Sequence, residues 1–424
     1  MKKTHANGIS YTRSYDALNR LKECNSDDVW FNLKYYYDLN GNIMYLEEKY
    51  YINRPEYMML SNGYDVFDRL TCCSMNDYQC YRILYYSYDK NGNRIGLNQN
   101  QYWGTVEGDS YLTEEYDVNS LNQLVNLTRI RLPRQGHLPV GEAEENEVSF
   151  IYNSRGNVTR VVDSDGDDIS FSYDLFDMLE STTKLGSDES VVRETSNAYD
   201  YRGRRISHIE NEDETQYSYG DGVSVLETKG AKTTLFYRGS DQGGGVGGIN
   251  YAEYSDGSEL NYKFYNLRGD VIFTLDGERR CSSSTYYYEF GKSEQLSGDI
   301  KTDRHRANTK VEDNDNLLNE GKRFRQLEYG IFLTPDPLEY VDGYNLYIYC
   351  GRNPWGKWVA ELQMNFKNEG VGINDPISGP APAGYTVKNA EISTNIEITG
   401  TGFTPGKIYT LAVEIICRKF HRAG

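Results

Sequence analysis

The chain has 424 residues, 63 acidic and 45 basic, which gives a formal net charge of −18 at pH 7. This sign is wrong for a phosphate-binding surface, so nucleic acid is not an expected partner. The chain has 39 tyrosines but only seven methionines, and its mean hydropathy is −0.71. This composition argues against a large hydrophobic core. They favour many thin, half-buried strands whose amphipathic rings pack on one side.

The first residues, MKKTHANGISYTRSYD, carry two lysines but no apolar stretch after them, so they do not form a signal peptide. No apolar run in the chain has the length of about 18 residues that a membrane-spanning helix needs. The repeats described next begin abruptly, without a capping segment, so we expect the chain to be part of a longer protein.

Eight variants of one phrase occur before residue 207, each a tyrosine, then Asp or Asn, two variable residues, a turn-tolerant residue and soon an aliphatic one. Self-similarity at roughly 20 to 50 residues indicates an array in which each unit buries its apolar face only against its neighbours. The predicted turn residues are Tyr15 with Asp16, Tyr37 with Asp38 and Gly41, Tyr64 with Asp65, Tyr88 with Asp89 and Gly92, Tyr116 with Asp117, Tyr152 with Gly156, Tyr173 with Asp174, and Tyr199 with Asp200 and Gly203.

Each phrase predicts a hairpin. The tyrosine ends a β-branched and aromatic run such as FNLKYYYD, and the Asp or Asn that follows starts a turn through its side chain. Glycine in four phrases supplies positive φ, which Asn19, Asp68 and Asp177 tolerate at the equivalent place. The fold class that follows is all-β.

Two kinds of turn alternate along the array. The phrases at Tyr15, Tyr64, Tyr116 and Tyr173 have Asn or Asp at the turn, and the other four have Gly. This predicts a double unit of two hairpins and roughly 50 residues. The phrase at Tyr116 is longer, with Asn122 as its expected turn residue, and residues 130–148 form an expected excursion loop.

Several tempting motifs have ordinary explanations. Residues 243–248 satisfy G-x-G-x-x-G, but neither a strand before nor a helix after is expected. DSDGDD at residues 163–168 imitates a calcium loop, yet it lies between two strand-like runs and predicts a hairpin turn. The five histidines are isolated and the seven cysteines lack a paired C-x-x-C set. No cofactor and no metal is therefore expected.

The second half carries a long, non-repeated pattern in residues 235–277 and 319–355. Together with the phrases, it resembles the YD repeat and the associated core of the bacterial Rhs family, which is related to toxin-complex shell subunits and to teneurins. The residues that match the core pattern are Arg323, Arg325, Gly330, Asp336, Pro337, Asp342, Gly343, Asn345, Leu346, Tyr347, Tyr349, Asn353 and Pro354.

The resemblance implies a β-sheet strip that spirals into a hollow shell, incomplete in this chain, which the core closes at one end. In the family the shell holds a C-terminal toxic polypeptide, and the core often cuts the chain after itself with aspartates of two D-P-x-G motifs. Here Asp336 and Pro337 remain, Glu339 replaces the usual Gly, and Val359 and Ala360 stand where the second Asp and Pro belong. Asp336 therefore lacks its expected carboxylate partner, and neither self-cleavage nor another enzyme activity is expected.

Three regions are expected: a repeat array at 1–215, a core region at 216–364, and a variable tail at 365–424 that reads as a short β module. The leading hypothesis is a structural shell that encloses and delivers a polypeptide, with the upstream part of the same shell as partner. The first alternative is a surface adhesion module that binds carbohydrate on tyrosine-rich sheets. The second is a self-cleaving core at Asp336. The resemblance implies export or a cell-surface location.

Overall fold

The structure is a computed structural model. It describes residues 2–5, 8–27, 31–51, 55–76, 80–103, 110–135, 138–139, 141–220, 223–238, 249–254, 260–298, 304–355, 364–367 and 395–398.

Nearly all regular structure in these residues is β. The strands of the first half are β1 (Lys2–Thr4), β2 (Ser10–Tyr15), β3 (Leu21–Ser26), β4 (Phe31–Tyr37), β5 (Ile43–Tyr51), β6 (Pro55–Tyr64), β7 (Leu70–Asn76), β8 (Cys80–Tyr88), β9 (Arg94–Trp103), β10 (Ser110–Val118), β11 (Leu124–Gln135), β12 (Leu138–Pro139), β13 (Glu144–Tyr152), β14 (Val158–Asp163), β15 (Asp168–Tyr173), β16 (Leu179–Leu185) and β17 (Val191–Tyr199). Those of the second half are β18 (Arg205–Glu210), β19 (Asp213–Gly220), β20 (Val223–Lys229), β21 (Lys232–Arg238), β22 (Ile249–Tyr254), β23 (Asn261–Tyr265), β24 (Val271–Leu275), β25 (Cys281–Tyr287), β26 (Ser293–Gly298), β27 (Val311–Asp313), β28 (Leu317–Asn319), β29 (Phe324–Gln326), β30 (Ile331–Phe332), β31 (Met364–Lys367) and β32 (Asn395–Ile398). Three short 3-10 helices are η1 (Ala307–Thr309), η2 (Glu339–Asp342) and η3 (Cys350–Arg352).

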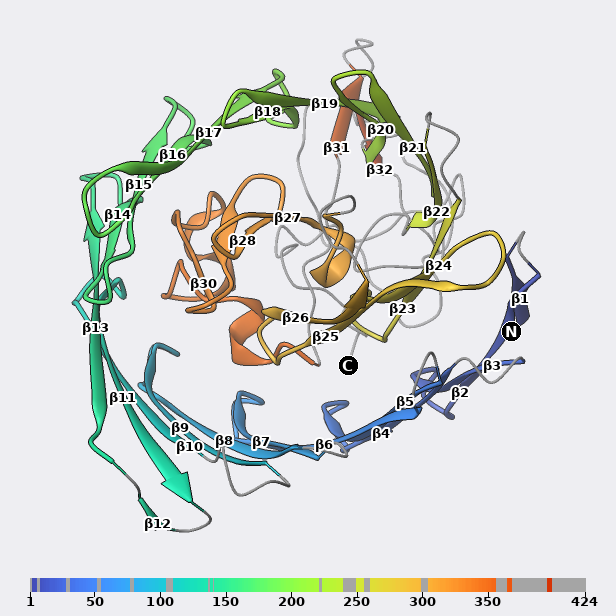
Figure 1. The fold of residues 1–424 in the computed structure, drawn as a ribbon, viewed down its shortest axis with the longest axis horizontal. Coiled ribbons are helices and arrows are strands. Elements are labelled where there is room, and N and C mark those ends of the chain that lie inside the picture. Colours follow the sequence, from blue (N-terminus) through green and yellow to red (C-terminus); the bar gives the residue numbers. More distant parts are fainter. Residues whose placement is uncertain are drawn as a thin grey trace.

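The first 26 strands form one sheet, and each strand pairs antiparallel with the next along the chain, except that the short β12 pairs only with β11, which also pairs with β13. Figure 1 shows that strands β1 to β22 wind around an open ring, while β25, β26, β27, β28 and β30 lie inside it. Strand twist accounts for the curvature, because successive strands of a long sheet rotate in one sense. The expected all-β spiral strip is confirmed, and its described strands leave the ring open.

One face of the strip is apolar and faces the inside of the ring. Along β4 the burial alternates, with Phe31, Leu33 and Tyr35 buried and the residues between them partly exposed. This period of two places every second side chain on the inner face. Most buried apolar residues of the strip and of the C-terminal elements belong to one cluster, and two smaller clusters surround Leu318 and Phe236.

The end of the strip packs against its beginning. The rings of Phe264 in β23 and Phe273 in β24 lie 5.8 and 5.6 Å from the ring of Phe31 in β4. In the next hairpin the ring of Phe290 meets Tyr86 edge-on at 5.5 Å. The strip therefore passes inside its own first turn, and the inner faces of β4 and β8 are covered by β23–β26.

The four-stranded sheet β27–β30 also lies within the ring in Figure 1. The region boundary expected at residue 215 lies inside β19, and the large sheet continues past it to Gly298. Within the described ranges, no α-helix occurs, and none of the helical turns has the length or apolarity to cross a membrane.

Candidate functional site

The eight phrases form eight hairpin turns with one hydrogen-bonding pattern. In the first, the Asp16 amide donates to the Arg20 carbonyl at 2.9 Å, and the Asn19 amide donates to the Asp16 carbonyl at 3.0 Å. The Asp16 carboxylate accepts from the amides of Leu18 and Arg20, both at 2.9 Å. The fourth turn residue has φ between 60 and 91° in each phrase, as the sequence predicts, at Asn19, Gly41, Asp68, Gly92, Asn122, Gly156, Asp177 and Gly203. These eight turns are termed the turn row.

The repeated tyrosine ties each hairpin to the one before it. The Tyr37 hydroxyl donates to the carbonyl of Leu21, the first residue after the previous turn, at 2.6 Å. The same bond recurs from Tyr64, Tyr88, Tyr152, Tyr173 and Tyr199 at 2.7 to 2.9 Å. Burial raises the pKa of Tyr37 and Tyr64, so these phenols stay protonated donors. The phenol is therefore a structural link between repeats.

Consecutive turns are also joined side by side, and the alternation in sequence sets how. After the first and third turns, which have Asn or Asp, an arginine donates to the next turn's carbonyl, as Arg69 does to Asp89 at 2.7 Å. After the first three Gly turns, an asparagine donates to the next turn's side chain, as Asn93 does to Asn122 at 2.9 Å. In the first four turns the kind of joint therefore alternates with the kind of turn.

The phrase at Tyr116 departs from the prediction. Asp117 lies within β10 opposite Asn126, and Asn119 instead starts the turn by accepting from the Leu121 and Gln123 amides at 2.9 and 3.1 Å. The predicted turn role of Asp117 is thus wrong, because the phrase is two residues longer and Val118 occupies the tyrosine position. The Tyr116 hydroxyl donates to Glu114 and accepts from Arg94 at 3.3 Å.

Residues 343–355, termed the docking segment, bind three of the four Gly turns. Asn353 donates to the Asn42 side-chain oxygen at 2.7 Å, and Asn345 donates in the same way to Asn93. Tyr347 donates from its hydroxyl to the Gly156 carbonyl at 2.8 Å. Asn42 and Asn93 are both 4% exposed, so loss of either partner would leave a buried amide unsatisfied.

Two core arginines anchor the docking segment to the strip from inside. Arg325 is fully buried, with its guanidinium 2.9 Å from the Glu320 carboxylate and 3.6 Å from the centre of the Tyr349 ring, and it donates to the Phe290 carbonyl. Arg352 donates to the carbonyls of Gly92 and Gly330 at 3.0 and 3.1 Å. The two buried guanidinium groups hydrogen-bond to carbonyl and carboxylate oxygens in place of water. These bonds hold residues 320–352 against the hairpins of the strip.

The other core-motif residues divide between structure and surface. Gly330 and Gly343 have φ of 64 and 129°, and Asn345 also accepts from the Tyr347 amide at 3.1 Å. Pro354 is buried, Leu346 is half-buried and Pro337 is exposed. Asp342 ends η2.

Asp336 lies beside a cation. Its carboxylate is 2.8 Å from the Arg323 guanidinium and accepts from the Leu338 amide at 2.9 Å. Arg323 in turn stacks on the Phe332 ring at 3.7 Å. Glu339, where the family pattern has glycine, has φ of 56° and closes the same turn. Val359 and Ala360, where the family pattern has the second Asp and Pro, lie outside the described residues.

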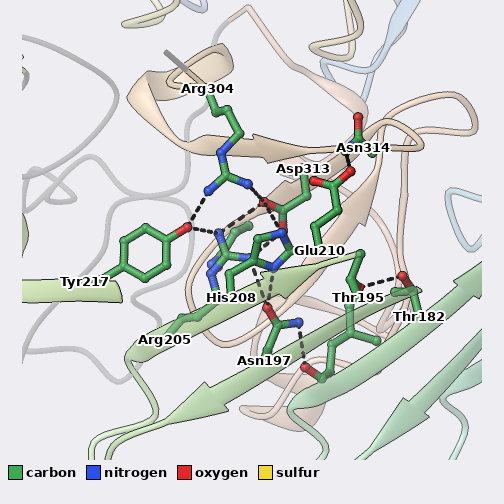
Figure 2. A network of polar contacts seen from close by, with 12 residues as sticks. Thr182, Thr195, Asn197, Arg205, His208, Glu210, Tyr217, Arg304, Asp313 and Asn314 are labelled. Carbon is green, nitrogen blue, oxygen red and sulfur yellow. Dashed lines mark hydrogen bonds and ion pairs between the residues drawn. The ribbon is translucent and has the colours of Figure 1, made fainter. Parts of the chain in front are cut away.

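A buried polar network joins β27 to the strip (Figure 2). Arg205 from β18 holds Asp313 from β27 with two hydrogen bonds, and Arg304 binds the same carboxylate at 3.1 Å. Tyr217 from β19 accepts from Arg304 at 2.5 Å. Burial alone would raise the pKa of Asp313, but the two guanidinium groups outweigh it and hold that pKa below its usual range.

His208 lies in the same network as a neutral ring. Its Nδ1 is 2.9 Å from the Asn197 side-chain oxygen, and its Nε2 is 4.0 Å from Asp313. Burial lowers the pKa of His208 to about 3, and Arg205 and Arg304 act in the same direction. The Asp313 carboxylate is already shared by Arg205 and Arg304. The network is therefore an ion-paired contact between β27 and the strip, and none of these groups is placed for acid–base chemistry.

The remaining sequence motifs carry no chemistry in the described part. Residues 163–168 form the hairpin turn between β14 and β15, with Asp167 and Asp168 paired to Lys184 and Arg160. No group of three His, Cys, Asp or Glu side chains arranged for a metal occurs among the described residues. The glycines of residues 243–248 lie outside them.

Comparison with known proteins matches the model of the RHS Repeat family to residues 152–188. This part of the chain is thus similar to an Rhs repeat. The chain is similar to the tRNA3(Ser)-specific nuclease WapA of Bacillus spizizenii, at 28% identity over 65% of this chain and 11% of the relative. The tRNA nuclease WapA of Bacillus subtilis strain 168 is 26% identical over the same shares. The chain thus spans about a tenth of the length of these curated relatives.

Solved structures of low similarity include the TcdB2-TccC3-Cdc42 crystal structure, at 16% identity and a TM-score of 0.37, with 82% of this chain and 21% of that chain covered. The Tc holotoxin pore of Photorhabdus luminescens, with the TccC3-D651A mutation, gives 15% identity and a TM-score of 0.34, with 82% and 21% covered.

Two sets of residues were missed in the sequence. The asparagines after the glycines, in NGN at 41–42 and 92–93, repeat visibly and would have indicated the contact with the docking segment. Asp313 and Arg205 have no such signal, because 108 residues separate them in the chain and nothing in either local sequence marks the pairing.

Proposed function

We propose that this chain is the closing part of an Rhs-type shell, a structural element that encloses and delivers a polypeptide without cutting itself. The observation that carries the proposal is the contact of the docking segment with the Gly turns Asn42, Gly92–Asn93 and Gly156. A segment held by buried hydrogen bonds along one rim of a ring closes that rim from inside. A container needs an end that is rigidly closed, whereas an open adhesive sheet does not need one.

The cargo in this proposal is a toxic polypeptide. The WapA relatives are named as tRNA nucleases, and the matched part is 11% of each relative, so a nuclease segment elsewhere in such a protein is compatible with a carrier role for this part. The chain itself acts as no enzyme in this proposal, since Asp336 is paired with Arg323. Its further partner is the upstream part of the same shell.

The division into regions belongs to the same proposal: an array at 1–215, a core region at 216–364 and a variable tail at 365–424. The hairpin pattern argues for a later end of the array. The turn at residues 266–270 repeats the bonding of the turn row, and the Tyr265 hydroxyl donates to the Ile249 carbonyl at 2.6 Å. The strip therefore supplies walls up to residue 298, and residues 304–355 supply the closure.

Limited proteolysis of the full chain tests this function. We expect cuts within residues 343–355 to be slow in the wild type and markedly faster in an Asn345→Ala/Arg352→Ala variant, since these side chains hold the docking segment on the Gly turns. Circular dichroism checks that the variant keeps its β structure. Equal cutting rates in two folded proteins would refute closure as the function.

A second candidate, carbohydrate binding, is favoured by tyrosines on the outer face of the strip. Tyr81 in β8 and Tyr102 in β9 are stacked at 6.3 Å, and Tyr81 and Tyr85 are 39% and 46% exposed. Exposed rings of this kind suit stacking on sugars. Binding to a glycan array that Tyr81→Ala/Tyr85→Ala abolishes would support an adhesive function, and no binding to any glycan would remove it.

A further inference from the structure

Two buried arginines lie close together where the docking segment meets the strip. Arg94 begins β9 and Arg352 ends η3, and they are 6% and 3% exposed. Both border Gly330: Arg352 donates to its carbonyl at 3.1 Å, and a Cβ atom built on this glycine would lie 3.5 Å from Nη2 of Arg94. Burial lowers the pKa of Arg352 to about 10, and the charge of Arg94 acts in the same direction. The two guanidinium groups therefore repel each other in a buried place.

Two hydrogen-bond donors of Arg94 are buried without a protein acceptor. Its Nη1 donates to the Tyr116 hydroxyl at 3.3 Å, whereas Nε and Nη2 have no hydrogen-bond acceptor among the described residues. The rings of Tyr86, Tyr116 and Phe290 lie around the guanidinium, with their centres 4.4 to 5.6 Å from it. Aromatic rings attract the cation but accept only weak hydrogen bonds. The two N–H groups therefore need a further acceptor, because a buried donor left unpaired is destabilising.

The carboxylates around these arginines are bound to other groups. Glu114 is held by Arg129 at 2.7 Å, Glu289 by Arg82 at 3.3 Å, and Asp89 by the side-chain amide of Asn93 at 2.7 Å. Asp89 raises the pKa of Arg352, but by less than burial and Arg94 lower it. Within the described part of the chain, Arg94 and Arg352 themselves hydrogen-bond to a hydroxyl and to two backbone carbonyls. Their two positive charges therefore have no bound counter-charge among these residues.

A small cavity borders both arginines. Its volume is about 20 Å³, and besides Arg94 and Arg352 its walls include Tyr116, Asn345 and Tyr347. This is room for one guest of about the size of a water molecule. The described side chains that line the cavity are basic, aromatic, amide or aliphatic, and none of them is acidic. The cavity is thus a cationic site with one wall on the strip and another on the docking segment.

From this arrangement we infer that the cavity binds one small monatomic anion of the size of chloride. A water molecule would accept from Arg94 but would leave both charges uncompensated, whereas an anion supplies the acceptor and the charge together. Phosphate and sulfate have more atoms than a cavity of this volume holds. Nε and Nη2 of Arg94 bind the ion from the strip, and Arg352 adds the second positive charge from the docking segment. The bound ion changes a repulsion between β9 and η3 into an attraction, and the site does not depend on what the shell encloses.

Calorimetric melting of the full chain, with sodium chloride replacing sodium gluconate at constant ionic strength, tests this inference. The wild-type melting temperature should rise by about 2 °C for each tenfold increase in chloride above the dissociation constant, because the unfolded chain has no such site. Arg94→Met should lose this chloride dependence. In gluconate the variant should melt no lower than the wild type, since it removes a buried charge without a partner. A merely structural role of Arg94 would instead give the same loss in both salts.

Arg82→Lys is the matched control, because Arg82 is also buried but is paired with Glu289, so this variant should keep the wild-type chloride dependence. Crystals of the wild type in sodium bromide give a second measurement that needs no variant: an anomalous bromine peak is expected beside Nε and Nη2 of Arg94. A wild-type melting temperature that does not depend on chloride, or an equal dependence in Arg94→Met, overturns the inference. A water molecule in place of the bromine peak also overturns it, as does a peak without chloride dependence, which would mean binding at crystal concentration only.

Discussion

Replacement of Asp313 by asparagine is the sharpest test of how the core is held in the ring. The carboxylate binds Arg205 and Arg304, and its side chain is 6% exposed. Asparagine keeps the shape but removes the negative charge between two guanidinium groups. The folded protein then contains a buried Arg205 and a partly exposed Arg304 whose shared counter-charge is gone.

The expected cost is about 3–5 kcal/mol of unfolding free energy, the range for removal of one member of a buried ion pair. An unfolding entropy of about 2.1 cal/mol/K per residue over roughly 350 folded residues is about 0.7 kcal/mol/K, so the melting temperature should fall by about 4–7 °C. Asp315, which pairs with Arg193 at 2.8 Å two residues further on, remains to hold the hairpin in place. We therefore expect weakened docking of a folded core.

Differential scanning calorimetry at pH 7 measures this shift. Asp167→Asn is the control, since its carboxylate is 61% exposed and binds Lys184 at 2.7 Å in a surface pair worth about 1 kcal/mol or less. The pKa of Asp313 is lowered in the folded state, so its contribution is complete above the unfolded value of about 3.9 and is lost as pH falls through the folded pKa. A melting temperature for Asp313→Asn within about 1 °C of the wild type at pH 7 would refute the reasoning.

Four further results are expected. Gly156→Ala should destabilise the protein by about 1–3 kcal/mol more than Gly141→Ala, because both glycines have positive φ but only the first Cβ would meet the Tyr347 hydroxyl, at 2.7 Å; equal urea midpoints would contradict this. Glu339→Gly should stabilise by about 0.5–1 kcal/mol, since glycine avoids the cost of φ 56°, whereas Leu338→Gly, at φ −89°, should destabilise. Burial raises the pKa of Glu312 to about 7, so the folded state binds more protons than the unfolded one between about pH 4.5 and 7. Stability should fall across that window by about 1–3 kcal/mol, and Glu312→Gln should lose this slope in pH-dependent calorimetry. Finally, the purified chain should stay near 48.7 kDa over days on gels, with Asp336→Asn unchanged, and cleavage near residue 362 that Asp336→Asn abolishes would reveal another carboxylate as partner.

The hairpin strip was predictable because its causes are local. A turn needs one residue with positive φ and one short acceptor three residues earlier, and both stand in every phrase within a few positions of each other. The same local pattern correctly predicts Asn122 as a turn residue. It wrongly predicts a turn role for Asp117, because this Asp also follows a tyrosine. Only the pairing of β10 with β11 shows that the strand continues to Val118. Local pattern gives the turn type, whereas register requires the neighbouring strand.

The sequence could not predict which residues lie inside the ring, for a physical reason. The apolar inner face of the strip can be covered either by a separate polypeptide or by the chain's own C-terminal elements. Both arrangements need the same alternation of apolar and polar residues along each strand. Phe264 and Phe273 cover Phe31, and the Asp313 network lies between β18 and β27, through contacts of residues that are far apart in sequence. Contacts between residues so far apart produce no periodicity or fixed spacing in the sequence from which they could be predicted.

The alternation of turn types links these two levels. At the first three Gly turns an asparagine follows the glycine. At Asn42 and Asn93 its amide nitrogen joins the next turn while its oxygen accepts from the docking segment. An arginine, which stands at the equivalent position of the first and third turns as Arg20 and Arg69, has no acceptor and could not serve both contacts. In this part of the array the alternation of turn types therefore decides which turns offer an acceptor to the docking segment.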